Sequence, residues 1–312
     1  LQRILYEQFS ASQALKEVEG VVAGDASASG GGGSTAAAAA PHVFQALQYL
    51  RKLCSHPALV LDPLLPQHQD AVAKVLHLRH TSSPPSSSAS GGKDTTWDQN
   101  IQRIKHDVSH APKLMALKEL LIDCGVARST GDDDLGGGGG SRRHAKKEEE
   151  EEGMQEDAGH RVLVFAQLRS LLDIVEESVL KPLGISSLRL DGGVPVASRF
   201  ERVQQFNADP TIGVMLLTTA VGGLGLNLTA ADTVVFLEHD WNPMADLQAM
   251  DRAHRLGQRR TVNVYRLLVA GTLEERVMSL QRFKLDVAAT VVNADNVSLA
   301  AMDTDNLLDL FT

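Results

Sequence analysis

Short apolar segments alternate with amphipathic stretches from residue 160 onward, and this alternation constrains the fold more than any other feature of the sequence. The apolar segments predict strands at residues 161–166, 188–190, 212–217, 233–237 and 262–269. The spacing of apolar residues between and after them predicts helices at 168–175, 195–206, 243–256 and 272–292. Strands that alternate with helices form a mostly parallel sheet with helices on both faces. The sequence therefore predicts an α/β fold.

Three other stretches have the composition of linkers. Residues 20–40 are mainly Gly, Ser and Ala, and residues 82–92 are Ser, Pro and Gly. Residues 129–159 hold a glycine run, a short basic patch and an acidic run. Such segments bury too little apolar surface to offset the entropy lost on ordering. We expect disordered insertions or linkers at 20–40, 81–100 and 128–159.

The net charge of −9 at first argues against a nucleic-acid partner, because phosphate binding requires basic residues. The charge is unevenly distributed, however. Residues 131–159 hold ten acidic and four basic residues, so two thirds of the net charge lies in a predicted linker. Between Trp241 and Lys284, eight basic residues face four acidic ones. The part of the chain expected to fold can therefore present a basic surface.

The cysteine content and the hydropathy pattern exclude several classes of protein. Cys54 and Cys124 are too few for a disulfide framework or a zinc site, so we expect no metal centre and a reducing compartment. No apolar run approaches the roughly 20 residues of a membrane span. The chain begins at Leu1 without an initiator Met or a signal peptide, so we expect it to be part of a longer protein.

Two loops after predicted strands carry unusual residues. The loop Thr218–Asn227 is rich in glycine, so its N–H groups can approach a phosphate closely, although glycine-rich turns also occur for steric reasons alone. Glu238 follows the fourth strand, where a magnesium-binding acid is found in some proteins. The neighbouring Asn242-Pro243 pair instead favours the start of a helix. We favour that second interpretation.

The predicted helix 243–256 is the most informative segment. Arg252 and Arg255 are three residues apart and Gln248 is four before Arg252, so all three share one face of a continuous helix. Two guanidinium groups on one face suit multidentate recognition of phosphate. A solvated basic face is the simpler alternative for such a pair.

Four blocks in this order resemble the second RecA-like lobe of Swi/Snf-type superfamily-two helicases: residues 162–167, 190–193, 217–227 and 248–258. Within that family, residues 110–114, 120–125, 234–244 and 304–311 resemble the branch associated with TATA-binding protein. The segment Leu50–Pro57 resembles the helical protrusion that precedes this lobe. One departure is Gly193, where the family usually has Ser or Thr.

The resemblance implies an organisation and a set of roles. It implies a helical protrusion at 1–80, a helical segment at 101–127, the RecA-like lobe at 160–271, and a brace helix with its tail at 272–312. Arg252 and Arg255 would be arginine fingers. The residues implied to line the nucleotide cleft are Gln248, Gly225 and Asn227. The residues implied to contact one DNA strand are Gln167, Asp191, Gly192, Thr218, Thr219, Gly222 and Trp241.

The resemblance also implies partners and a location. The cofactor would be ATP with Mg²⁺, held mainly by an N-terminal lobe of the same polypeptide. The partners would be double-stranded DNA and TATA-binding protein, in the nucleus. The 312 residues contain no Gly-x-x-x-x-Gly-Lys-Ser/Thr loop and no DEAH-type box. We therefore expect the chain alone to bind nucleotide poorly and not to hydrolyse it.

Two other classes remain as alternatives. The first is a docking module that binds DNA or protein without catalysis. The second is a nucleotide-sugar or methyl-transfer domain that uses the glycine-rich loop. This second alternative leaves the cluster of Arg252, Arg255 and Gln258 unexplained.

Overall fold

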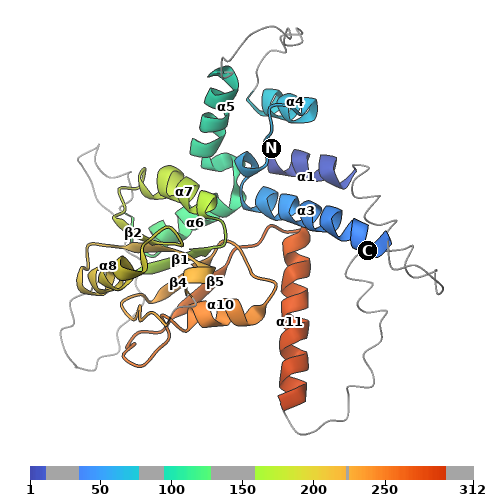
Figure 1. The fold of residues 1–312 in the computed structure, drawn as a ribbon. Coiled ribbons are helices and arrows are strands. Elements are labelled where there is room, and N and C mark those ends of the chain that lie inside the picture. Colours follow the sequence, from blue (N-terminus) through green and yellow to red (C-terminus); the bar gives the residue numbers. More distant parts are fainter. Residues whose placement is uncertain (12–34, 77–94, 128–158, 223–224, 293–312) are drawn as a thin grey trace, which may run out of the picture.

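The computed structural model describes residues 1–11, 35–76, 95–127, 159–222 and 225–292 (Figure 1). The predicted insertions lie largely outside these residues. Two predictions at their ends are wrong, because helix α3 (Thr35–Ser55) and helix α5 (Thr95–His106) begin inside the segments predicted as linkers at 20–40 and 81–100. The alanine run at 36–40 explains the first error, since alanine has the highest helix propensity of all residues.

The predicted parallel sheet is present. Its strands are β1 (Val162–Ala166), β2 (Ser187–Leu190), β3 (Val214–Thr218), β4 (Thr233–Phe236) and β5 (Asn263–Arg266). They lie in the order β2-β3-β1-β4-β5, and all four pairings are parallel. Every residue of β1, β3 and β4 is buried. Strand β5 is shorter than predicted and half exposed, because it lies at an edge with β4 on one side only.

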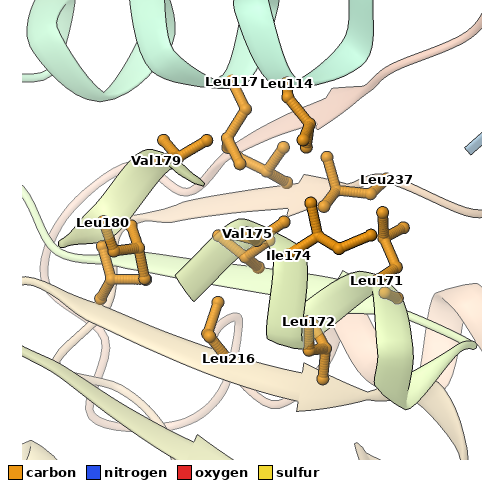
Figure 2. Close-up of a cluster of buried hydrophobic side chains, with 14 of the residues drawn as sticks. Leu114, Leu117, Leu171, Leu172, Ile174, Val175, Val179, Leu180, Leu216 and Leu237 are labelled. Carbon is orange, nitrogen blue, oxygen red and sulfur yellow. The ribbon is translucent and has the colours of Figure 1, made fainter. Parts of the chain in front are cut away.

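Alternate residues of the central strands face two separate cores. Val162 and Val164 face the first core, beneath α6 (Pro112–Asp123), α7 (Arg169–Val175) and its π-helical continuation η3 (Glu176–Leu180). Figure 2 shows leucines of α6 meeting the apolar side chains of α7 and η3. Leu163 and Phe165 face the second core, beneath α8 (Val196–Ala208) and α10 (Pro243–Met250). The helices thus cover both faces of the sheet.

A group of helices lies beside this lobe. It comprises α1 (Gln2–Ser10), α3, η1 (Pro57–Leu59), α4 (Pro66–Val75), α5 and η2 (Val108–His110). We call α1, α3, η1 and α4 the protrusion. Leu5, Leu53 and Ala71 form a small core of their own within it. Helix α3 crosses the N-terminal end of α11 (Leu273–Val292) (Figure 1). Of the described helices, none has the length and apolar character that crossing a membrane requires.

Candidate functional site

The predicted site residues follow the carboxyl ends of neighbouring parallel strands, where α/β proteins bind their ligands. Gln167 follows β1, and its Nε2 lies 3.2 Å from Asp240 Oδ2 in the loop after β4. Thr219 follows β3, and its hydroxyl donates to the carbonyl of Ala166 at the end of β1, at 3.3 Å. The structure therefore brings the loops after β1, β3 and β4 together at one edge of the sheet.

Asp191, at the end of β2, is buried and holds its own loop. Its carboxylate accepts hydrogen bonds from the N–H of Gly193 and from Nε of Arg189, both at 2.6 Å, and it lies 3.4 Å from Nε of Arg169. Burial acts to raise the pKa of Asp191, but these hydrogen bonds and the two arginine charges outweigh it and lower the pKa. Asp191 thus fixes the loop that exposes Gly192.

Gly193, where the resemblance implies Ser or Thr, lies against the side chain of Arg169. A Cβ atom at this position would lie 2.5 Å from Nη2 of Arg169 and 3.0 Å from Oδ1 of Asp191. The guanidinium of Arg169 thus lies where a Ser or Thr side chain would begin. Arg169 is mostly exposed, so its flexible side chain has room to move aside for a Ser or Thr at this position.

The glycine-rich loop after β3 begins as a short helix, α9 (Thr219–Gly222). Thr218 and Thr219 are buried, so their side chains support the loop, and Gly222 ends the helix. Residues 223–224 lie outside the described part. Gly225, the next described residue, has a φ of +54°, a left-handed conformation that glycine adopts without strain.

One prediction about the arginine pair is wrong. Helix α10 ends at Met250, so Arg252 and Arg255 lie in turns after the helix and do not share a helical face with Gln248. After Met250 the main-chain hydrogen bonds tighten to three residues, because the N–H of Arg252 donates to the carbonyl of Ala249 at 3.3 Å and that of Ala253 to the carbonyl of Met250 at 3.0 Å. The carbonyl of Arg252 accepts from the N–H of Leu228, at 3.0 Å.

Further hydrogen bonds join the arginine turns to the glycine-rich loop and the residues that follow it. Nη1 of Arg255 donates to the carbonyl of Gly225 at 3.2 Å, and the rest of its side chain is exposed. Gln258 donates to the carbonyls of Thr229 and Ala231, at 3.1 and 2.7 Å. Asn227 is exposed nearby. The structure therefore brings Gly225 and Arg255 together. Gln258 joins the two segments by hydrogen bonds, a role that the sequence analysis did not assign to it.

The loop after β4 confirms the favoured interpretation of the Asn242-Pro243 pair. Asn242 is the N-cap of α10, and its side chain accepts from the N–H of Met244 at 3.1 Å. Both carboxylate oxygens of Glu238 are engaged by hydrogen-bond donors of the protein, and its side chain is buried. Trp241 is half-buried, and its carbonyl accepts from Nζ of Lys284 on α11, at 2.9 Å.

Other features of the described residues do not form part of this edge. In the resolved ranges, no cluster of three or more His, Cys, Asp or Glu side chains has the arrangement of a metal site. A cavity of about 360 Å³ lies between η1, α5, α7 and η3, and Lys105 and Glu177 are among its lining residues. None of the predicted site residues lines this cavity.

Comparison with known proteins agrees with this geometry. A model of the helicase conserved C-terminal domain matches residues 145–257, which include β1 to β4 and the turns of Arg252 and Arg255. TATA-binding protein-associated factor 172 of Homo sapiens is 50% identical over 314 residues, which cover 100% of this chain and 15% of the human protein. The chain contains a helicase conserved C-terminal domain.

Two further comparisons define how far the likeness extends. The chromatin-remodeling ATPase INO80 of Cryptococcus neoformans var. neoformans is 47% identical over 153 residues, which cover 49% of this chain and 9% of that protein. The crystal structure of the C-terminal part of the Fun30 ATPase domain matches with a TM-score of 0.56 at 22% identity, covering 90% of this chain and 85% of that one. The helicase lobe thus has a RecA-like fold, and the chain spans about 15% or less of these curated relatives.

Proposed function

We propose that this helicase lobe is the C-terminal half of the motor of an ATP-dependent double-stranded-DNA translocase that remodels protein–DNA complexes. The observation that carries the proposal is the tie between Arg255 and the glycine-rich loop at Gly225. This hydrogen bond supports the proposal because it holds an exposed guanidinium against the loop that follows β3, and α/β proteins bind their ligands at the carboxyl ends of their strands.

The arginine turns are suited to the phosphates of a nucleotide. When bound, ATP with Mg²⁺ supplies the phosphoryl transfer that drives movement, and an N-terminal lobe of the same polypeptide would hold most of it. Arg255 and Arg252 would add positive charge as phosphoryl transfer proceeds, an effect worth about 10³–10⁵ in rate. Gly225, Asn227 and Gln248 would line the same cleft.

The loops after β1, β2 and β3, with Trp241, would contact one DNA strand. Their proposed contact residues are Gln167, Asp191, Gly192, Thr218, Thr219, Gly222 and Trp241. Main-chain groups and small side chains suit phosphates and sugars, which carry no direct sequence information, as a translocase requires. Trp241 would stack on a sugar or a base. The exposed Arg169 and Lys284 would attract a phosphate backbone at this edge, where Asp191 and Asp240 offset part of their charge.

The target of remodelling is inferred from the relatives. The human relative carries the name of a factor associated with TATA-binding protein, and it matches the whole of this chain. We propose that the full protein removes TATA-binding protein from DNA in the nucleus and so regulates transcription.

The experiment that tests this function compares two exposed arginines in the full-length protein. Arg255→Ala is expected to lower the maximal DNA-stimulated rate of ATP hydrolysis by about 10³-fold or more, with the dissociation constant for DNA unchanged within about twofold. Arg259→Ala is the matched control, because Arg259 is an exposed arginine four residues away. Full turnover by Arg255→Ala would contradict the proposal and favour a docking module without catalysis.

A further inference from the structure

The motif Ser55-His56-Pro57 ends helix α3 of the protrusion, and the proposed function gives it no role. His56 and Pro57 shape the turn that follows α3, because Nδ1 of His56 accepts from the N–H of Ala58 at 3.1 Å and Pro57 begins η1. Ser55 does more. Its hydroxyl lies 2.9 Å from the carbonyl of Arg51 within α3 and 2.6 Å from Oε1 of Glu238. This second contact joins residues 183 positions apart in the sequence.

Glu238 carries the connection onward to the predicted DNA-contact loop. Its other oxygen, Oε2, accepts from the N–H of Gln167 at 2.7 Å and from the N–H of Leu168 at 2.8 Å. These two residues lead from β1 into α7, so the carboxylate lies at a helix N-terminus, where negative charge is favoured. One buried side chain therefore bonds to the protrusion through one oxygen and to the Gln167 loop through the other.

The end of α3, which carries Ser55, is hydrogen-bonded to α1. Nε2 of Gln2, on α1, donates to the carbonyls of Leu53 and Cys54 at 2.5 and 2.7 Å, which satisfies two groups in the last turn of α3. Ser55 and Gln2 are both buried. Because the end of α3 is fixed to α1, a displacement of the protrusion moves the Ser55 hydroxyl with it.

We propose that Ser55 is a positioning residue, which fixes the Gln167 loop through Glu238 and so couples the protrusion to the engagement of DNA. The inference rests on the proposed function, in which Gln167 contacts a DNA strand. It adds a role for a helix that lies outside the helicase lobe. Ser55 itself is buried and would not touch the nucleic acid.

The test uses three serines that share one geometry. The hydroxyls of Ser10, Ser55 and Ser279 each lie within hydrogen-bond distance of the carbonyl four residues earlier, and among the described contacts of these three serines only that of Ser55 reaches another element. In the full-length protein, Ser55→Ala is expected to raise the DNA concentration for half-maximal ATPase stimulation about three- to tenfold, because one hydrogen bond to a carboxylate is lost. The maximal rate at saturating DNA is expected to stay within about twofold of wild type.

The control variants separate positioning from stability. Ser10→Ala and Ser279→Ala are expected to leave half-saturation unchanged, and Ser55→Thr, which keeps the hydroxyl, is expected to restore it. Should Ser55→Ala fail to fold, Ser55→Cys keeps the volume with a weaker donor, and a two- to threefold increase, roughly, is then expected.

Each contrary outcome has a distinct meaning. A folded Ser55→Ala or Ser55→Cys protein with wild-type half-saturation overturns the inference. A fall in the maximal rate with unchanged half-saturation does so as well, since it assigns Ser55 a role other than DNA engagement. A wild-type protein whose ATPase does not respond to DNA overturns the proposed function, whereas a responsive wild type with an indistinguishable Ser55→Ala overturns this inference alone.

Discussion

Lys113 of α6 is expected to be among the most sensitive positions of the chain for stability. Its Nζ donates to the carbonyl of Leu237, at 2.6 Å, and to a carboxylate oxygen of Glu274 at the start of α11. The side chains of Lys113 and Glu274 are 3% and 8% exposed. Lys113→Met fills most of the same volume but leaves both acceptors buried without this donor. We expect the free energy of unfolding to fall by about 3–5 kcal/mol, the usual cost of removing one partner of a buried ion pair.

Urea denaturation followed by circular dichroism measures this loss. Arg3→Met is the matched control, because the Arg3–Glu7 pair on α1 is exposed and its removal is expected to cost less than about 1 kcal/mol. The double variant Lys113→Met/Glu274→Gln removes the uncompensated charge, so it is expected to recover part of the loss. A loss below about 1 kcal/mol in Lys113→Met would refute the reasoning, since the buried acceptors would then have found other donors.

Two further predictions concern nucleotide turnover and pH. The 312-residue chain alone is expected to show no DNA-stimulated ATP hydrolysis in a phosphate-release assay, because its sequence has no Walker A loop; measurable turnover contradicts this. Burial, with the charges of His110 and Lys105, lowers the pKa of His56 to about 4. The unfolded chain therefore binds more protons than the folded one between pH 6.5 and 4, so the unfolding free energy should fall as pH decreases through this window, by up to about 3 kcal/mol. His56→Asn should lose most of this slope in urea titrations at several pH values, and an unchanged slope would exclude His56 as its source.

The fold followed from periodicity because periodicity reports burial directly. Strands β1, β3 and β4 are buried on both faces, so they form unbroken apolar runs that are visible without any tertiary information. The end of α10 was not visible in this way. The pattern of residues 243–256 suits a longer helix, but after Met250 the main-chain hydrogen bonds tighten to three residues, and the carbonyl of Arg252 accepts from the N–H of Leu228, which only the fold brings near.

The same limit applies to the site. The family resemblance, rather than any local pattern, singled out Gln167 and Thr219, and the structure brings their loops to one sheet edge because the carboxyl ends of parallel strands lie together. The partners of Glu238 could not be predicted from the sequence, since they are a serine 183 residues away and two main-chain N–H groups. No local pattern records such partners. The local sequence is the same whether a glutamate is buried among three hydrogen-bond donors or is open to a cation.

Release of labelled TATA-binding protein from a TATA-containing duplex, followed in time after ATP is added to the full-length protein, tests the central claim most directly. The account predicts release by the wild type and by Arg259→Ala. It predicts that Arg255→Ala binds the complex with near wild-type affinity but fails to release TATA-binding protein. Release by Arg255→Ala at the wild-type rate would contradict the claim that this lobe supplies a catalytic arginine to an ATP-driven motor.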